Sequence, residues 1–211
     1  MKKIILLSIF TTFCFSQTEE WIYHNSLDGV SRVKPDGSEN ELLMGNVSIS
    51  DVSEDGNKLL LMGNPAPHTE TIYLINLESM DTLSITYVHE EYGPDQPSPL
   101  QPTLTYDENV ILFLNRESDG YESYNELWKY SFIDSSETVI ADWLDRNFGF
   151  ITLSPDKREV AVFKNYGDSV DVAIVDIQSG ETSILGTFGN LCNVGFTGSM
   201  SSWGEDDYIY F

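Results

Sequence analysis

The sequence predicts an all-β fold made of repeated units, and three observations lead to this prediction. An acidic turn followed by an apolar segment recurs about every fifty residues along the chain. Each unit then contains the same succession of short strand-like segments separated by turn residues. Helical periodicity is nearly absent after the first sixteen residues. Four short strands in a period of this length are typical of a propeller blade, so we predict a β-propeller of four-stranded antiparallel blades. A two-sheet sandwich is the alternative, but it does not explain the period.

The repeat is marked by four aspartates in acidic turns, each closely followed by an apolar segment. The aspartates are Asp55, Asp107, Asp156 and Asp206, and the apolar segments are 59–62, 110–114, 160–163 and 208–211. These segments do not alternate between polar and apolar residues, as expected of strands buried on both faces. They are therefore predicted to be the second strand of each blade.

The other strands follow in the same order within each unit. First strands are predicted at 48–52, 102–105, 150–153 and 200–203, third strands at 72–77, 127–132 and 172–177, and fourth strands at 82–86, 138–140 and 182–185. The segment before the first full unit fits the last three strands of a blade, at 21–24, 30–34 and 41–44. We expect about four blades plus the start of another, and hence a chain that is truncated within a longer propeller.

The first sixteen residues have the layout of a secretory signal peptide. Lys2 and Lys3 precede an apolar run from Ile4 to Phe15, and small residues stand before the predicted cleavage point at Gln17. We therefore predict a signal peptide at 1–16, a propeller domain at 17–211, and a periplasmic or secreted location of the Gram-negative type. A membrane anchor formed by the same segment is the alternative. No later segment is long and apolar enough to span a membrane.

The composition excludes some classes of partner. The chain carries 11 Lys and Arg against 34 Asp and Glu, a net charge of −23. Nucleic acids are excluded as partners, because binding phosphates needs clustered cations. The charge promotes solubility, and it would also attract a basic protein surface or divalent cations. After signal cleavage Cys192 is the single cysteine, so no internal disulfide is expected.

The longest predicted loops share one face of the propeller, because they join second to third strands or consecutive blades. They are 63–71, 87–101, 115–125, 142–149 and 164–171. Binding usually resides on long loops of a rigid scaffold. Two of these loops contain the candidate partner-binding residues, which are Tyr87, Glu90, Glu91, Tyr92, Tyr121 and Tyr124. Aromatic residues among acids suit a protein or peptide with basic anchors, although the tyrosines could instead pack the loops onto the blades.

One loop also matches part of a calcium-binding template. Asn115, Glu117, Asp119 and Glu126 fall at positions 1, 3, 5 and 12, with Gly120 at position 6. The expected flanks are strands rather than helices, and an ordinary wide hairpin is the alternative. Apart from this calcium hypothesis, no metal site and no cofactor are predicted. The three histidines have no metal-ligand spacing, and neither a G-x-S-x-G elbow nor a phosphate-binding loop occurs.

Several of these segments resemble the repeats of TolB-type, WD40-like (PD40) propellers. The resemblance rests on Ser154-Pro155-Asp156-Lys157, on the run from Asp176 to Thr182, and on Lys34-Pro35-Asp36-Gly37-Ser38. It implies a non-enzymatic periplasmic scaffold that binds a protein or peptide on its long-loop face. The alternative is the propeller portion of an enzyme, either the gate of a prolyl-oligopeptidase-like hydrolase or a propeller-type polysaccharide lyase, because propellers occur in both.

Overall fold

The computed structural model describes residues 14–15, 21–88, 98–118, 123–144, 151–165, 169–189, 202–204 and 208–210. All of the regular secondary structure in this part of the chain consists of β-strands. Accordingly, the described residues contain no helix that is long and apolar enough to cross a membrane.

The described strands form four sheets of four antiparallel strands and one two-stranded sheet. Blade 1 contains β1 (Cys14–Phe15), β2 (Ile22–Ser26), β3 (Gly29–Val33) and β4 (Glu41–Gly45). Blade 2 contains β5 (Val47–Val52), β6 (Lys58–Gly63), β7 (Thr69–Asn76) and β8 (Thr82–Val88). Within each blade the strands are hydrogen-bonded in the order of the sequence, as expected of a β-meander.

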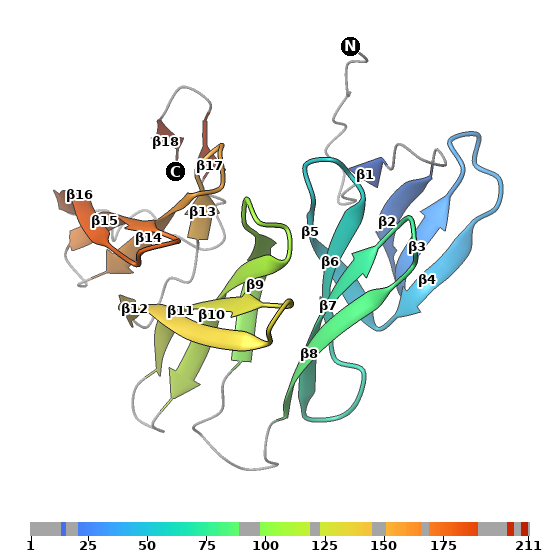
Figure 1. Cartoon of the computed structure of the whole chain (residues 1–211), viewed down its shortest axis with the longest axis horizontal. Helices are drawn as coiled ribbons and strands as arrows, with labels where there is room; N and C mark the ends of the chain where they lie inside the picture. The colour runs from blue at the N-terminus through green and yellow to red at the C-terminus, as the bar shows by residue number, and fades with distance from the viewer. Residues whose placement is uncertain are drawn as a thin grey trace.

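The same order continues in the second half of the chain. Blade 3 contains β9 (Ser98–Leu104), β10 (Val110–Ser118), β11 (Ser123–Ser131) and β12 (Ser136–Leu144). Blade 4 contains β13 (Ile151–Leu153), β14 (Glu159–Asn165), β15 (Ser169–Asp176) and β16 (Thr182–Gly189). The pair β17 (Ser202–Trp203) and β18 (Ile209–Tyr210) follows. The sheets succeed one another from the blue end of the chain to the orange end (Figure 1).

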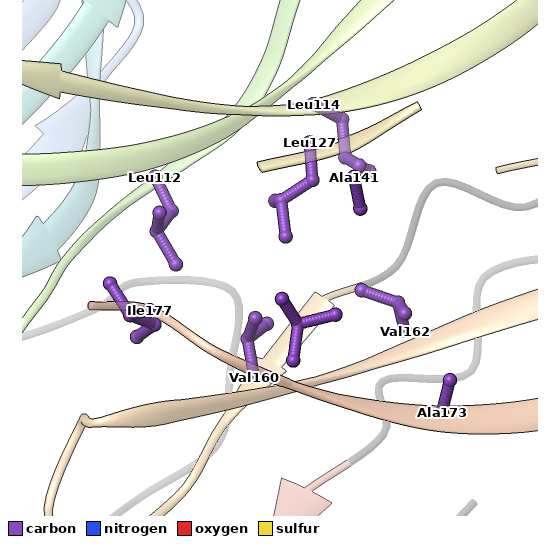
Figure 2. Packing of buried hydrophobic residues seen from close by; sticks show 9 residues of the cluster. Leu112, Leu114, Leu127, Ala141, Val160, Val162, Ala173 and Ile177 are labelled. Carbon is purple, nitrogen blue, oxygen red and sulfur yellow. The ribbon is translucent and has the colours of Figure 1, made fainter. Parts of the chain in front are cut away.

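The apolar core lies between consecutive blades. One cluster joins residues of blades 1 and 2, among them Tyr23 and Leu61, and a second joins blades 2 and 3 through residues such as Leu60 and Phe113. The third joins blades 3 and 4, where Leu112 and Leu127 face Val160 and Val162 (Figure 2). The second strands of blades 2 and 3, β6 and β10, contribute to the clusters on both of their sides. This confirms for these two strands the prediction from the apolar segments that they are buried on both faces.

Polar hydrogen bonds connect the innermost strands of neighbouring blades. The Asp51 carboxylate in β5 accepts hydrogen bonds from Thr103 Oγ1 and from the backbone N–H of Leu104, both at 2.8 Å. Thr103 and Leu104 belong to β9, so one side chain holds two blades together. The carboxylate is half-buried, and hydrogen bonds to a charged acceptor in such a place are stronger than those between neutral groups.

The repeat aspartates shape the turns between first and second strands. Asp55 Oδ1 accepts from Ser53 Oγ at 2.6 Å and from the Asn57 N–H at 2.9 Å. Asp156 repeats this arrangement with Ser154 and Arg158. The hydrogen bond from the serine is the main cause that lowers the pKa of each carboxyl below its usual range. The acidic turn that defines the repeat is therefore a structural feature.

Two expectations about the loops are corrected. The predicted loop 115–125 is largely a hairpin, because β10 extends to Ser118 and β11 begins at Ser123. The predicted loop 164–171 is shortened in the same way by β14 and β15, which pair as far as Asn165 and Val170. Backbone pairing extends into these polar segments because a ladder needs only N–H and C=O groups.

Blade 1 differs from the prediction in having a fourth strand. Cys14 and Phe15 pair with Tyr23 and Ile22, in a segment assigned to the signal peptide. That assignment stays a prediction. Cleavage before Gln17 would remove β1 and leave the inner edge of β2 without this partner.

Candidate functional site

The two ends of the blades differ in how their polar groups are used. At one end, here called the turn face, tight turns join first to second and third to fourth strands. Their carboxylates are hydrogen-bonded within their own turns, as Asp36 is to Ser38, Asp134 to Ser136 and Asp176 to Ser179. The hydrogen bonds with Ser38 and Ser179 lower the pKa of Asp36 and of Asp176, and hydrogen bonds first with Ser131 and then with Ser136 lower that of Asp134. The carboxylates of Asp36, Asp134 and Asp176 thus serve their own turns.

The opposite end, here called the long-loop face, has longer connections in blades 2 to 4. They are residues 64–68, 89–97, 119–122, 145–150 and 166–168, as the strand bounds define them. Blade 1 is an exception, because Leu27 and Asp28 form its hairpin turn and Asn46 alone joins it to blade 2. The longer connections therefore belong to blades 2 to 4.

An aromatic row lies between blades 2 and 3. Tyr87, near the end of β8, packs against Phe113 of β10 with ring centroids 5.7 Å apart. Phe113 stacks in turn against Trp128 of β11, with centroids 6.4 Å apart and planes 28° apart. Phe113 is fully buried, whereas Tyr87 and Trp128 are half-buried and keep part of their surface accessible. The row offers aromatic surface at the boundary between two blades.

Two carboxylates stand beside this row. Glu126 accepts a hydrogen bond from Trp128 Nε1 at 2.8 Å. Glu137, in β12, accepts one from the Tyr87 hydroxyl across the blade boundary. Burial raises the pKa of Tyr87 well above its usual range, and Glu137 raises it further, so the hydroxyl stays protonated and donates. We refer to Tyr87, Phe113, Glu126, Trp128 and Glu137 as the blade 2–3 cluster.

Asn115 extends this cluster toward the long-loop face. It lies directly opposite Glu126 in the β10–β11 ladder, and its side chain is only 2% exposed. Its Oδ1 has no hydrogen-bond partner, which is costly for a buried polar atom. The next pair on the same side of the ladder is Glu117 and Tyr124, of which the structure describes the backbone. A predicted tyrosine and three residues of the predicted calcium set thus share one side of the hairpin.

The ladder does not have the form of the calcium template. Asn115, Glu117 and Glu126 lie on two paired strands, whereas the template needs one continuous loop that wraps the ion. Asp119 lies outside the described residues. In the part of the chain that the structure describes, no three His, Cys, Asp or Glu side chains gather in a way that could hold a metal ion.

Most of the predicted partner-binding residues cannot be placed. Glu90, Glu91, Tyr92 and Tyr121 lie outside the described residues. Tyr87 is placed, and its ring packs between two blades, which is the packing role considered as the alternative for these tyrosines.

The sequence reasoning missed Phe113, Trp128 and Glu137. The spacing of two between Tyr124, Glu126 and Trp128 was the available signal, because alternate residues of a strand share one face. Chemically, the cluster combines half-buried aromatic surface with carboxylates. This combination suits a lysine or arginine side chain, which aromatic faces attract through cation–π interactions and carboxylates attract through ion pairs.

Comparison with solved structures identifies the fold. TolB from Acinetobacter baumannii matches with 18% identity and a TM-score of 0.54, over 82% of this chain and 42% of that one. A propeller of Dos1 matches with 12% identity and a TM-score of 0.57, over 93% and 51%. An oligogalacturonate lyase in complex with manganese matches with 9% identity and a TM-score of 0.60, over 83% and 52%.

These similarities show that the chain has a β-propeller fold, as predicted. The chain spans about half the length of these solved chains. At such low identities the likeness establishes the fold alone, since propellers host many functions. No protein-family model and no curated protein sequence matches the chain.

Proposed function

We propose that this chain is an exported, non-enzymatic β-propeller scaffold that binds a protein or peptide through a lysine or arginine side chain. The blade 2–3 cluster carries the proposal, because it joins accessible aromatic surface to carboxylates at a boundary that leads toward the long-loop face. The net charge of −23 supports a basic partner by drawing it toward the propeller. The turn face is a weaker candidate for binding a cationic side chain. Its aspartates Asp36, Asp134 and Asp176 already accept hydrogen bonds within their own turns.

A peptide-binding experiment tests the role of the two carboxylates. The probes are short neutral peptides with one central arginine, lysine or norleucine, in about 0.15 M salt, where the Debye length of ~8 Å suppresses long-range attraction. We expect the arginine and lysine peptides to bind more tightly than the norleucine peptide. Glu126→Gln and Glu137→Gln each keep the shape of the side chain and remove its charge. Each should weaken binding of the cationic peptides about tenfold, equivalent to ~1.4 kcal/mol.

Glu54→Gln is the matched control, because Glu54 is an exposed carboxylate on the turn face. It should change the Kd less than twofold, as a rough bound for an exposed charge. Equal weakening by all three variants would mean that net charge alone attracts the peptides. Equal binding of norleucine and arginine peptides would refute recognition of a cation.

Export is supported by the N-terminal pattern of two lysines, an apolar run and a small residue at the predicted cleavage point. Expression of the whole gene in a Gram-negative host should give a protein whose first residue is Gln17, as read by N-terminal sequencing. A cytoplasmic product that begins at Met1 would refute export.

The enzymatic alternative draws support from the similarity to the oligogalacturonate lyase, which covers 52% of that enzyme's chain. Depolymerisation of oligogalacturonate by the purified chain with manganese would favour this alternative over the scaffold.

A further inference from the structure

A small cavity on the turn face lies between blades 3 and 4, away from the blade 2–3 cluster. Its volume is about 120 Å³, and its lining comes from the turn after β9, from β11 and β12, and from the turn after β15. Two hydrogen bonds across the blade boundary fix its walls. The Tyr106 N–H donates to the Lys157 carbonyl at 3.2 Å, and Lys129 Nζ donates to the Ile177 carbonyl at 3.0 Å.

Lys129 brings a positive charge to the wall of the cavity, and this charge helps to lower the pKa of Asp176 in the adjacent turn. The side chain is half-buried, and its one hydrogen bond within the described residues, to the Ile177 carbonyl, uses one of the three ammonium protons. Ion pairs in the described residues join Arg32 to Glu41, Lys58 to Glu108 and Arg158 to Asp156, and none of them includes Lys129. A partly desolvated ammonium is stabilised by an anionic acceptor. This cation therefore favours an anionic ligand in the cavity.

The other polar side chains of the lining are hydroxyls, the Gln178 carboxamide and the Asp107 carboxylate; the Ser136 hydroxyl donates to Asp134. Thr138 lies opposite Lys129 in the β11–β12 ladder, and Ser136 lies opposite Ser131. Asp107 accepts hydrogen bonds from Asn109 through Oδ1, and its Oδ2 accepts none from the described residues. A ligand that presented only negative charge would be repelled by Asp107. A ligand that also carries a donor would satisfy this second oxygen.

We propose that this cavity binds a small carboxylate with a hydrogen-bond donor on the adjacent carbon, the pattern of a hydroxy acid or an amino acid. Lys129 would bind the carboxylate, and Asp107 would accept from the hydroxyl or ammonium group. The cavity is open to solvent, and its volume of about 120 Å³ suits a small acid of about three carbons. Arg158, 5.4 Å from the Tyr106 ring centroid, adds a second cation near the rim.

The test is a titration of the whole ¹⁵N-labelled chain followed by amide chemical shifts. The probes are lactate, alanine, acetate and lactamide. We expect lactate or alanine to shift the amide resonances of Ser131 and Thr138. Tighter binding of lactate would identify the preferred donor as a hydroxyl, and tighter binding of alanine would identify it as an ammonium group. Lactamide lacks the negative charge and acetate lacks the donor. Each should bind at least about tenfold more weakly, because each loses one charge-assisted hydrogen bond.

Variants assign the binding to Lys129. Lys129→Gln should weaken binding about tenfold, whereas Lys129→Arg should keep most of it, because the charge remains. The control is Lys58→Gln, which removes a lysine paired with Glu108 at the preceding blade boundary and should leave binding unchanged. If Lys129→Gln fails to fold, Thr138→Val removes a lining hydroxyl with little change of shape and should also weaken binding. The proposal is overturned by equal affinity for lactate and lactamide, by unchanged binding in these variants, or by the absence of shifts with every acid.

Discussion

Aspartate side chains shape the tight turns that link strands within the blades. In the turn after β5, Asp55 accepts from Ser53 Oγ and from the Asn57 N–H, and Asp156 does the same in blade 4. Each of these carboxylates is stabilised in its charged form, which lowers its pKa. Part of the strongly acidic composition is therefore explained by turn formation.

The lowered pKa of Asp55 predicts a change of stability with pH. Because the folded-state pKa lies below the ordinary value of 3.8, the contribution of Asp55 is fully present above that value. It is lost as the pH falls through the folded-state pKa. Asp55→Asn keeps an oxygen acceptor but cannot ionise, so its stability should depend less on pH in this window.

Urea unfolding between about pH 5 and about pH 2.5 measures this difference. Glu54→Gln, at the exposed neighbouring residue, is the control and should leave the pH dependence as it is in the parent chain. A parallel pH dependence in the parent and in Asp55→Asn would contradict a stabilised Asp55 carboxylate.

The outermost strand of a blade contains a β-bulge at the same place in three of the four full sheets. The register shifts lie between Val30 and Ser31, between Leu127 and Trp128, and between Val172 and Ala173, while the β7–β8 ladder of blade 2 is regular. The extra residue is Leu43, Ile140 or Leu185. Leu43 and Ile140 pack against the core shared with the following blade. In blades 1 and 3 the bulge thus turns one more apolar side chain toward the next blade, whereas Leu185 in blade 4 is exposed.

How far the sequence predicts the fold depends on the element. Second strands such as 59–62 were found because a strand buried on both faces is an apolar run, which few other elements produce. The hairpin ends were missed because Asn115 and Glu117 are polar, and pairing there depends on backbone groups that carry no sequence signal. The bulges are marked only by adjacent apolar pairs such as Val139 and Ile140. The candidate site was predicted in part, since Trp128 required knowledge of the register.

Close backbone contact within blade 2, between β6 and the start of β5, requires a glycine at the end of β6. A Cβ at Gly63 would lie 2.2 Å from the Asn46 carbonyl oxygen and 2.7 Å from Val47 Cα. Gly63→Ala should therefore destabilise the chain by about 1–3 kcal/mol in urea unfolding, because backbone atoms must move.

Gly45→Ala is the matched control at the end of β4. A Cβ there meets only the Asp28 carbonyl oxygen, at an ordinary distance of 3.6 Å. The substitution should change stability by no more than about 0.5 kcal/mol. Equal effects of the two substitutions would mean that the close approach of Gly63 to the backbone of Asn46 and Val47 is not maintained in solution.

At the scale of the whole molecule, the cohesion of the propeller comes from contacts between neighbouring blades. Each of the three hydrophobic clusters in the described residues combines side chains of two consecutive blades. The hydrogen bonds of Asp51 and Lys129 also cross from one blade to the next. Stability should then be the sum of blade and boundary contributions, as in other repeat proteins, with each boundary acting mainly on its neighbours.

A core substitution at one boundary tests this local coupling. Leu112 is fully buried in the cluster between blades 3 and 4, and Leu112→Ala should cost about 2–5 kcal/mol. Ile184→Ala is the control, because that side chain is 67% exposed and its removal should cost no more than about 0.5 kcal/mol.

Hydrogen exchange resolved by strand gives the readout. In Leu112→Ala the amides of β10, β11, β14 and β15 should exchange faster, while those of β2 and β3 in blade 1 should keep their rates, because two intact boundaries separate them from the defect. A uniform acceleration in all blades would instead show that the molecule opens as a single cooperative unit, and the additive description of blades and boundaries would have to be abandoned.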